Sequence, residues 1–274
     1  MIPAAPEGTF RVVTWNLWWR FGDDPDARHR AIGRVLGEVR PDVLCLQEVH
    51  GTEAGADRSA DLATSLDLRH VRSEHPSFRG EIFANAVLSR WPVLDRGQVA
   101  LVDGSGQPGH RSAVWARLDA PFGPMPVIST HLAFRFDESE LRQQQATQLL
   151  ELVDELRGDP DADPPVLIGA DLNALPDSDE LRLLTGRRPA PVRGLVMTDA
   201  WPQVREDPGH TWDRRVPYLA NSAWPQRRLD YVLVSWPRPR PLGNPVQAFL
   251  IGDDAVDGIW PSDHLGVAVD LRVR

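Results

Sequence analysis

Short apolar runs recur along the chain and are separated by polar segments rich in Gly, Pro, Asp and Ser. Runs of this length, with many β-branched and aromatic residues, are typical of β-strands. We predict strands at residues 10–17, 43–49, 82–89, 112–118, 126–130, 165–168, 229–235 and 265–273, with a weaker one at 246–251. Residues 97–109 contain several Gly and a Pro, so we predict a loop there.

Two further segments have apolar residues every three or four positions, the spacing of one helix face. The first begins at Asp24-Pro25, a helix cap followed by proline in the first turn, and ends at Arg40-Pro41. The second covers about 138–157, and the elements fall into two halves that meet near residue 125. A sheet with a helix on one face must bury its other face, most simply against a second sheet. We therefore expect one domain over 1–274, with two packed sheets inside and helices outside.

The charge of the chain limits its partners. Its 274 residues have a formal net charge of -9, and the 30 basic residues are all Arg. This charge disfavours a protein that coats nucleic acid through a basic surface, and the absence of Lys excludes a Lys nucleophile. Arg, a planar guanidinium, is suited to a two-pronged contact with phosphate.

The single cysteine and the N-terminal segment carry little functional information. Cys45 lies in an apolar run, where we expect a reduced residue of the core. We find no basic leader followed by an apolar stretch, and no apolar run reaches the ~18 residues that a membrane span needs. A cytoplasmic protein is therefore the default expectation.

Polar side chains occur just after or within six of the apolar runs. Asp171 and Asn173 follow the run at 165–168, and in a continuing strand they would point to the same face. The other segments are Trp15-Asn16-Leu17, Leu46-Gln47-Glu48-Val49, Ser129-Thr130-His131-Leu132, Arg228-Leu229-Asp230-Tyr231 and Pro261-Ser262-Asp263-His264-Leu265. Any one alone is weak, because a single His or Glu beside a strand is usually structural or solvated. Several carboxylates in one cleft need compensation by cations or donors, so together they indicate a metal ion or a proton relay.

The residue types favour a hard cation. No Cys and His spacing typical of zinc is present. Glu48, Asp263 and Asn16 offer oxygen ligands, which suit Mg²⁺ or Mn²⁺.

These motifs, in this order, resemble the endonuclease/exonuclease/phosphatase superfamily, which includes deoxyribonuclease I, exonuclease III-type enzymes, neutral sphingomyelinases and inositol-polyphosphate phosphatases. The matching stretches are TWNL with Asn16, LQEV with Glu48, NAVLSRWPV with Asn85, STHL with His131, GADLNALPDS with Asp171 and Asn173, RRLDYVLVS with Asp230, and PSDHLGV with Asp263 and His264. The match covers about residues 10–270. The resemblance implies a four-layer α/β/β/α sandwich and a metal-dependent hydrolase that uses water to cleave phosphodiester bonds.

The resemblance also implies roles for single residues. Glu48 would hold the divalent ion, helped by Asn16 and Asp263. Asp171 would orient or deprotonate the attacking water, and Asn173 would contact the phosphate. Asp230 would pair with His264 and raise its pKa, with His264 acting either as base or as electrostatic stabiliser.

Other residues would act on the leaving group and the substrate. His131 resembles the second histidine of deoxyribonuclease I, a general acid with a carboxylate partner. Glu81 is the candidate partner here, and a plain surface charge is the alternative. Arg111 opens a strand where relatives contact phosphate, and Asn85 would hold the site together. Trp212 and Asn221, with Tyr218 between them, would stack on a base or line a headgroup pocket, or simply pack within their loop.

Nucleic acid is the commonest substrate class in this superfamily, so a nuclease is the leading expectation. A sphingomyelinase-like or inositol-phosphate phosphatase activity is the main alternative, because the acidic chain without Lys is unlike a duplex binder. No amphipathic membrane hairpin is evident, however. A non-catalytic binding module is a further alternative, disfavoured because every expected position is filled. We expect a monomer that acts on a phosphodiester with Mg²⁺ or Mn²⁺.

Overall fold

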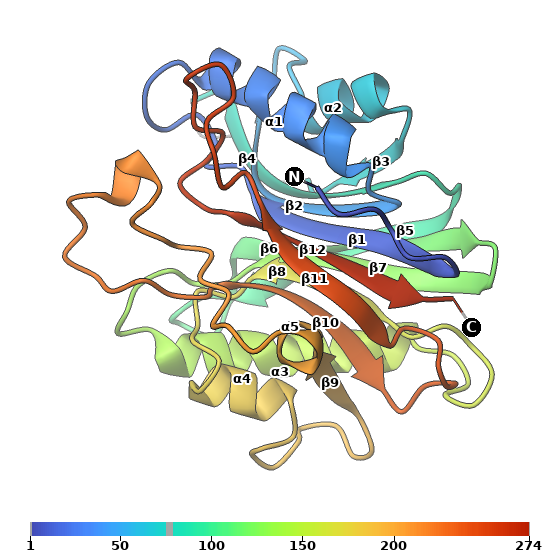
Figure 1. Ribbon diagram of the computed structural model, residues 1–274. Coiled ribbons are helices and arrows are strands. Elements are labelled where there is room, and N and C mark those ends of the chain that lie inside the picture. The colour runs from blue at the N-terminus through green and yellow to red at the C-terminus, as the bar shows by residue number, and fades with distance from the viewer. Residues whose placement is uncertain (1, 75–78, 274) are drawn as a thin grey trace.

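Two six-stranded β-sheets lie face to face with helices over their outer faces, so the molecule has four layers (Figure 1). This computed structural model describes residues 2–74 and 79–273. It confirms the α/β/β/α sandwich that the sequence predicted. Within the described residues, no helix is both long enough and apolar enough to cross a membrane.

The first sheet has the strand order β11-β12-β1-β2-β4-β3. Its strands are β1 (Thr9–Asn16), β2 (Val43–Thr52), β3 (Arg69–Arg72), β4 (Glu81–Ser89), β11 (Pro245–Ile251) and β12 (Gly266–Arg272). Helices α1 (Pro25–Val39) and α2 (Arg58–Leu66) cover its outer face. As predicted, the side chain of Asp24 caps α1 by accepting a hydrogen bond from the N–H of Ala27.

The second sheet has the order β5-β6-β7-β8-β10-β9. Its strands are β5 (Val93–Val102), β6 (Pro108–Ala120), β7 (Gly123–His131), β8 (Leu167–Asp171), β9 (Val196–Asp199) and β10 (Asp230–Trp236). Helices α3 (Ser139–Leu156) and α4 (Asp179–Leu184) pack on its outer side, and the short α5 (Trp201–Val204) follows β9. A 3-10 turn, Pro217–Leu219, lies in the long segment before β10.

Both faces of the central strands are covered, which explains why their sequences are nearly continuous apolar runs. In β1, Val12 packs in the core between the two sheets, whereas Val13 packs in the core under α1 and α2. The alternation of side chains along a strand thus assigns one set to each core. A third core lies between the second sheet and α3.

Two sequence predictions are wrong. The chain does not divide near residue 125, because β11 and β12 return to the first sheet and leave β5 to β10 in the second. Residues 97–109 are mostly strand, from β5 and β6, with only a short turn between them. Gly97 is a packing position, since a Cβ there would lie 2.8 Å from the indole of Trp115. The strand is a half-exposed edge, so its apolar pattern is weak.

Candidate active site

The predicted polar residues converge at one edge of the two sheets. β1, β7 and β8 end there with Asn16, His131 and Asp171, and the antiparallel β10 begins there with Asp230. The segment that leads into β12 brings Asp263 and His264 to the same place, because β12 runs antiparallel to β1. The site is therefore built by strand direction: carboxyl ends of some strands meet amino ends of their antiparallel neighbours.

Glu48 reaches this edge through a β-bulge. In a regular strand the residue after Gln47 would point to the helix-covered face. The register of β2 with β4 shifts between Leu46 and Val49, and Glu48 has a left-handed backbone with φ of 53°. The bulge turns the Glu48 carboxylate toward Asn16, which donates from Nδ2 to its Oε1 at 3.1 Å.

Asp171 and Asn173 lie together, but not because the strand continues. β8 ends at Asp171, and Asn173 is left-handed with φ of 48°. The backbone N–H of Asn173 donates to Asp171 Oδ1 at 2.9 Å, and its Nδ2 donates to the carbonyl of Leu132 at 3.3 Å. A tight turn closed by the Asp171 side chain therefore replaces the strand geometry that the sequence suggested.

Asn16 connects the two acidic residues. Besides its bond to Glu48, its Nδ2 donates to Asp171 Oδ2 at 2.9 Å. Its Oδ1 accepts from the backbone N–H of Trp18 at 2.9 Å, which fixes the orientation of the amide. The side chain is 1% exposed. Asn16 thus holds two carboxylates near each other as a shared donor.

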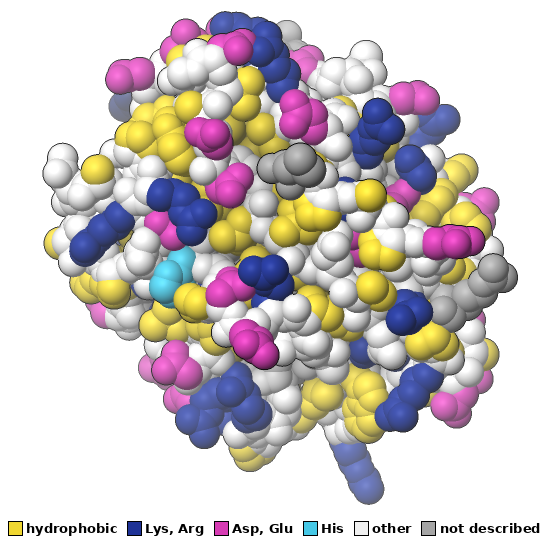
Figure 2. All heavy atoms as spheres, viewed as in Figure 1, with side chains coloured by type: hydrophobic (Ala, Val, Ile, Leu, Met, Phe, Trp, Pro, Cys, Tyr) yellow, Lys and Arg dark blue, Asp and Glu magenta, His cyan; other side chains and the backbone are white. Residues whose placement is uncertain are grey.

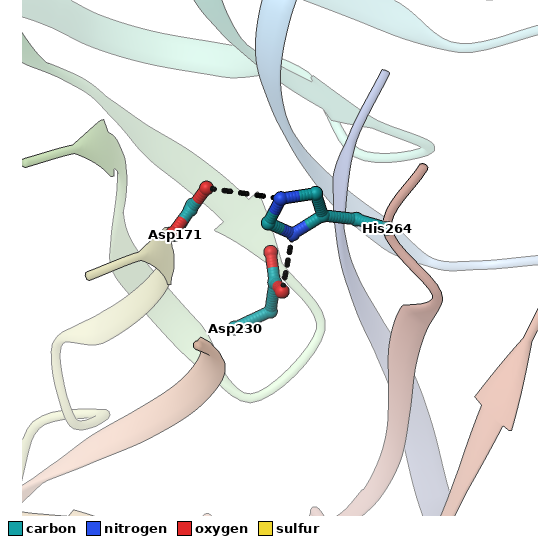
Figure 3. A group of neighbouring side chains, drawn as sticks. All are labelled: Asp171, Asp230 and His264. Carbon is teal, nitrogen blue, oxygen red and sulfur yellow. Dashed lines mark hydrogen bonds and ion pairs between the residues drawn. The ribbon is translucent and has the colours of Figure 1, made fainter. Parts of the chain in front are cut away.

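His264 lies between two carboxylates (Figure 3). Its Nδ1 donates to Asp230 Oδ2 at 2.8 Å, and its Nε2 lies 3.9 Å from Asp171 Oδ2. Burial disfavours a charged imidazole, but the negative charges of Asp230 and Asp171 outweigh it and raise the pKa of His264 well above its ordinary value. His264 is therefore a cation at neutral pH.

His131 has the opposite character. Its Nε2 lies 3.5 Å from Asp171 Oδ2, and its Nδ1, 3.9 Å from Glu48 Oε1, has no hydrogen-bond partner within 2–74 and 79–273. Burial and the positive charge of Arg111 lower the pKa of His131 well below its ordinary value. One site thus contains a charged and a neutral imidazole.

Glu81 is not placed to partner His131, which corrects the sequence prediction. Its carboxylate accepts from Nη1 of Arg20 and pairs with Nε2 of His50. These partners follow β1 and lie in β2, so Glu81 ties the rim of the site instead.

The donor set fits a hard divalent cation. Oε2 of Glu48 is buried and lacks a hydrogen-bond partner in the described part of the chain. Burial and the nearby charge of Asp263 raise the pKa of Glu48 to about 7. Burial also raises the pKa of Asp263 to about 6, although His264 opposes this. Two carboxylates that repel each other and one unfilled oxygen are what an oxygen-seeking ion relieves.

A second group could also hold a metal ion by distance alone. Ligand atoms of Asp171, Asp230 and His264 lie within 4.8 Å of one another. A protonated imidazole has no free lone pair for a metal, however, and Nδ1 of His264 is already bonded to Asp230. Glu48 and Asp263 are therefore the residues that could hold a divalent ion.

Arg111 and Asn85 lie on facing strands of the two sheets, β6 and β4. Nη1 of Arg111 is buried with no hydrogen-bond partner among the residues that the structure describes, and the charges of Glu48 and Asp171 act on this guanidinium. Nδ2 of Asn85 donates to the carbonyl of Ser112 at 2.9 Å and so ties β4 to β6. Nη1 of Arg111 is thus available to an anion, and Asn85 stabilises β6, the strand that carries Arg111.

The long segment before β10 forms one wall of the site. The ring of Trp212 is nearly parallel to that of His264, with 6.4 Å between centroids and 7° between planes. Tyr218 packs against Trp18 instead, with centroids 4.5 Å apart, and Asn221 is exposed. Only Trp212 of the three therefore contacts a residue of the polar cluster.

Sequence reasoning overlooked two arginines. Arg28 of α1 is 1% exposed and donates to the carbonyls of Leu17 and Pro261, so it holds together the segments that carry Asn16 and Asp263. A charged residue four positions before Ile32, on the apolar face of the helix, was the available signal. Arg227 lies under aromatic rings beside Trp212. Nothing in the local sequence distinguishes it from its neighbour Arg228.

Comparison with known proteins gives the following relationships. The sequence profile of the Endonuclease/Exonuclease/phosphatase family matches residues 13–264. No curated protein matches the chain at a significant level. The crystal structure of D. rerio TDP2 complexed with single strand DNA product has a TM-score of 0.76 and 19% identity, over 97% of this chain and 100% of that one.

Two further solved structures are similar. The human Nocturnin catalytic domain with bound sulfate anion has a TM-score of 0.72 and 18% identity, over 98% of this chain and 96% of that one. An endonuclease/exonuclease/phosphatase from Beutenbergia cavernae DSM 12333 has a TM-score of 0.68 and 26% identity, over 97% of this chain and 72% of that one. At such identities, the first two likenesses concern the fold alone.

Proposed function

Because the chain belongs to the endonuclease/exonuclease/phosphatase family, we propose that it hydrolyses phosphodiester bonds of nucleic acid with water, in a reaction that depends on Mg²⁺ or Mn²⁺. The observation that carries the proposal is the hydrogen-bonded chain from Glu48 through Asn16 to Asp171, with the Asp230–His264 pair beside it. Five separate segments contribute these residues. Nothing in packing alone requires the buried carboxylates of Asp171 and Asp230, the largely covered one of Glu48 and a charged imidazole at one place.

The divalent ion would be held by Glu48 and Asp263, with Asn16 fixing the position of the Glu48 carboxylate. When bound, the ion supplies positive charge to the phosphate oxygens and the leaving oxygen. The unfilled, buried Oε2 of Glu48 supports this assignment.

Asp171 is the group that orients the attacking water. Burial alone would raise the pKa of Asp171, but the positive charge of His264 and the hydrogen bonds from Asn16 and Asn173 lower it. The carboxylate is therefore ionised at neutral pH and can accept a hydrogen bond from water.

His264 acts as an electrostatic stabiliser and not as a base. A base must be neutral to accept a proton, whereas the pKa of His264 is raised by Asp230 and Asp171. Its protonated Nε2 faces the side of Asp171 and can donate to a phosphate oxygen as negative charge develops there. Asp230 holds the proton at Nδ1 and so fixes the direction of the ring.

His131 and Arg111 act around the same phosphate. The lowered pKa of His131 makes it a neutral hydrogen-bond donor or acceptor for the leaving oxygen, and not a strong acid. The unpaired Nη1 of Arg111 can donate to a non-bridging oxygen.

Single-stranded nucleic acid suits the surface better than a duplex does. On the face shown in Figure 2, acidic and basic side chains are interspersed, and the net charge of the chain is -9. A duplex binder relies on a basic stripe, whereas single strands bind largely by stacking of bases on aromatic rings. Phe134, Phe136 and Trp224 are 61%, 46% and 47% exposed on the segments after β7 and before β10.

A phospholipid headgroup or an inositol phosphate is the second candidate. The same exposed rings would also suit the interface of a membrane, where aromatic side chains are enriched.

A substrate panel tests the proposal. Single-stranded DNA, duplex DNA, RNA, sphingomyelin vesicles and inositol phosphates would each be incubated with the protein in EDTA, Mg²⁺ or Mn²⁺. We expect metal-dependent cleavage of single strands, abolished in Asp171→Asn and His264→Ala. Asp95→Asn removes the same kind of charge from exposed β5 and should leave cleavage unchanged. Activity that persists in EDTA would refute the metal dependence, and hydrolysis restricted to headgroups would refute the nucleic-acid substrate.

A further inference from the structure

Arg227 is a buried cation whose donors are largely unused. Its side chain lies just before β10 and is 7% exposed. Nε and Nη2 are both buried, and neither has a hydrogen-bond partner anywhere in residues 2–74 or 79–273. Leaving such donors unpaired in a buried place costs free energy, so native proteins rarely do it without a reason.

Aromatic rings surround the guanidinium without satisfying it. Its Cζ lies 3.9 Å from the ring centroid of Trp212 and 4.5 Å from that of Phe136, with Trp224 at 5.9 Å. Phe136 and Trp224 are themselves stacked, with centroids 3.8 Å apart. Ring faces attract the cation and fix its plane, but the N–H bonds point outward in that plane. The result is a rigid donor fork, of the kind that binds phosphate in a two-pronged contact.

The fork belongs to the same cleft as the polar cluster, but to a separate position from Arg111. The charge of Asp171 acts on Arg227, and Trp212 lies parallel to the ring of His264. Arg111 lies 5.8 Å from the ring of Phe134, whereas Arg227 lies against Phe136, two residues further along the same segment. The two guanidiniums therefore contact different rings of one segment and mark separate anion positions.

We propose that Arg227 binds a second phosphate of the substrate, next to the phosphate that is cleaved. The site then selects substrates with at least two neighbouring phosphates, such as an oligonucleotide strand, over those with a single phosphodiester. This inference rests on the proposed function and narrows its substrate class. It also disfavours sphingomyelin, whose headgroup offers one phosphate beside a cation.

The stability of an Arg227 variant separates a binding role from a structural one. Replacing an uncompensated buried charge by an apolar side chain of similar length is expected to be neutral or stabilising. Arg227→Met should therefore keep or raise the midpoint of thermal unfolding without substrate. A clear fall in that midpoint would mean that the cation holds the loop together, and would overturn the proposal.

The kinetic test compares the thymidine dinucleotide TpT, with one phosphate, and the trinucleotide TpTpT, with two, in Mg²⁺. We expect the wild-type protein to prefer TpTpT. Arg227→Met should lower kcat/KM for TpTpT roughly 10- to 100-fold, mostly through KM, because a charge-assisted contact is lost. The same variant should leave kcat/KM for TpT unchanged. Arg227→Lys keeps the charge but not the fork and should fall between the two.

Arg215→Gln is the matched control. It removes the same charge from the same segment, but Arg215 is half-exposed and already paired with Asp213. This variant should leave kcat/KM unchanged for both TpT and TpTpT. Equal losses on TpT and TpTpT in Arg227→Met would overturn the second-phosphate position while leaving the proposed nuclease intact. If the wild-type protein cleaved neither TpT nor TpTpT but hydrolysed inositol polyphosphates in a reaction that required Arg227, the proposed nuclease activity would be refuted. The preference for substrates with two neighbouring phosphates would stand.

Discussion

Gly169 lets the two sheets approach each other directly beneath Asp171. A Cβ at position 169 would lie 2.4 Å from Cβ of Cys45 and 2.7 Å from its Sγ, on the facing strand β2. Carbon atoms in contact need about 3.5–4.0 Å. Gly169→Ala therefore forces β8 and β2 apart by at least about 1 Å, since a Cβ cannot rotate out of the way.

The displacement acts where the site is least tolerant. Asp171 is two residues further along β8, and its Oδ2 lies 2.9 Å from Nδ2 of Asn16 on the other sheet. Overpacking of a core typically costs about 1–3 kcal/mol of unfolding free energy. A misplacement of about 1 Å can cost on the order of 100-fold in rate. We expect Gly169→Ala to lower kcat/KM about 100-fold while the protein remains folded, as measured by steady-state kinetics and urea unfolding.

Second-site variants test the cause. Cys45→Gly removes the Cβ that the new methyl group would strike, at a cost of roughly 1 kcal/mol for glycine in a strand. Cys45→Ala removes only Sγ and keeps the closest atom. Gly169→Ala should thus regain activity when combined with Cys45→Gly but not with Cys45→Ala, in a double-mutant cycle. Full activity of Gly169→Ala alone, or equal rescue by both Cys45 variants, would refute the reasoning.

The remaining predictions concern other buried polar groups. Asp230→Asn should lower kcat by at least about 100-fold, because it no longer holds His264 as a cation; unchanged kcat would contradict this. Arg11 and Asp270 form a buried two-pronged ion pair at 2.7 and 2.8 Å. Asp270→Asn should therefore lower the free energy of unfolding in urea by about 3–5 kcal/mol. A loss as small as that from breaking an exposed ion pair would contradict this prediction. Burial lowers the pKa of His29 to about 4, so as pH falls from 6.5 the unfolded chain takes up this proton first and stability falls, by up to about 3 kcal/mol at pH 4. His29→Asn should flatten that loss, and an identical pH profile would exclude His29 as its source.

Much of the fold could be predicted because both faces of the inner strands are covered. Such strands are continuous apolar runs, and β1, β7 and β10 were located to within a few residues. Edge strands carry no such signal. β5 and β3 are half-exposed, and their sequences alternate weakly, so β5 was predicted as a loop and β3 was overlooked.

The candidate site could be predicted only as far as the strand ends reveal it. The positions of Asn16, Asp171 and Asp230 follow from where apolar runs stop. The left-handed backbone of Glu48 depends on pairing with β4, which lies far away in sequence. The pairing of Glu81 with His50 likewise depends on the pairing of β4 with β2. The aromatic surroundings of Arg227 arise from segments outside the strands, whose paths no local pattern determines.

A buried polar layer beneath the site explains the spacing of the motifs. Gln47 is fully buried; its Nε2 donates to Oγ of Ser129 at 3.1 Å and to the carbonyl of Gly169 at 3.2 Å, and its Oε1 accepts from Oγ1 of Thr14 at 3.3 Å. These bonds tie β1, β2, β7 and β8 together across the gap between the sheets.

Each strand therefore carries two functional positions. Thr14, Ser129 and Gly169 face the other sheet. Thr14 and Ser129 hydrogen-bond to the Gln47 side chain, and Gly169 lets the two sheets come close together. Two residues later on the same face, the strands end in Asn16, His131 and Asp171. In β2 the residue that links the strands, Gln47, is adjacent to the site residue, Glu48. Only the bulge lets both side chains point into the space between the sheets. Without the hydrogen bonds of Gln47, each strand would keep its site residue but would no longer fix where that residue lies. Gln47→Leu should therefore impair the reaction, although it removes none of the polar side chains that line the cleft.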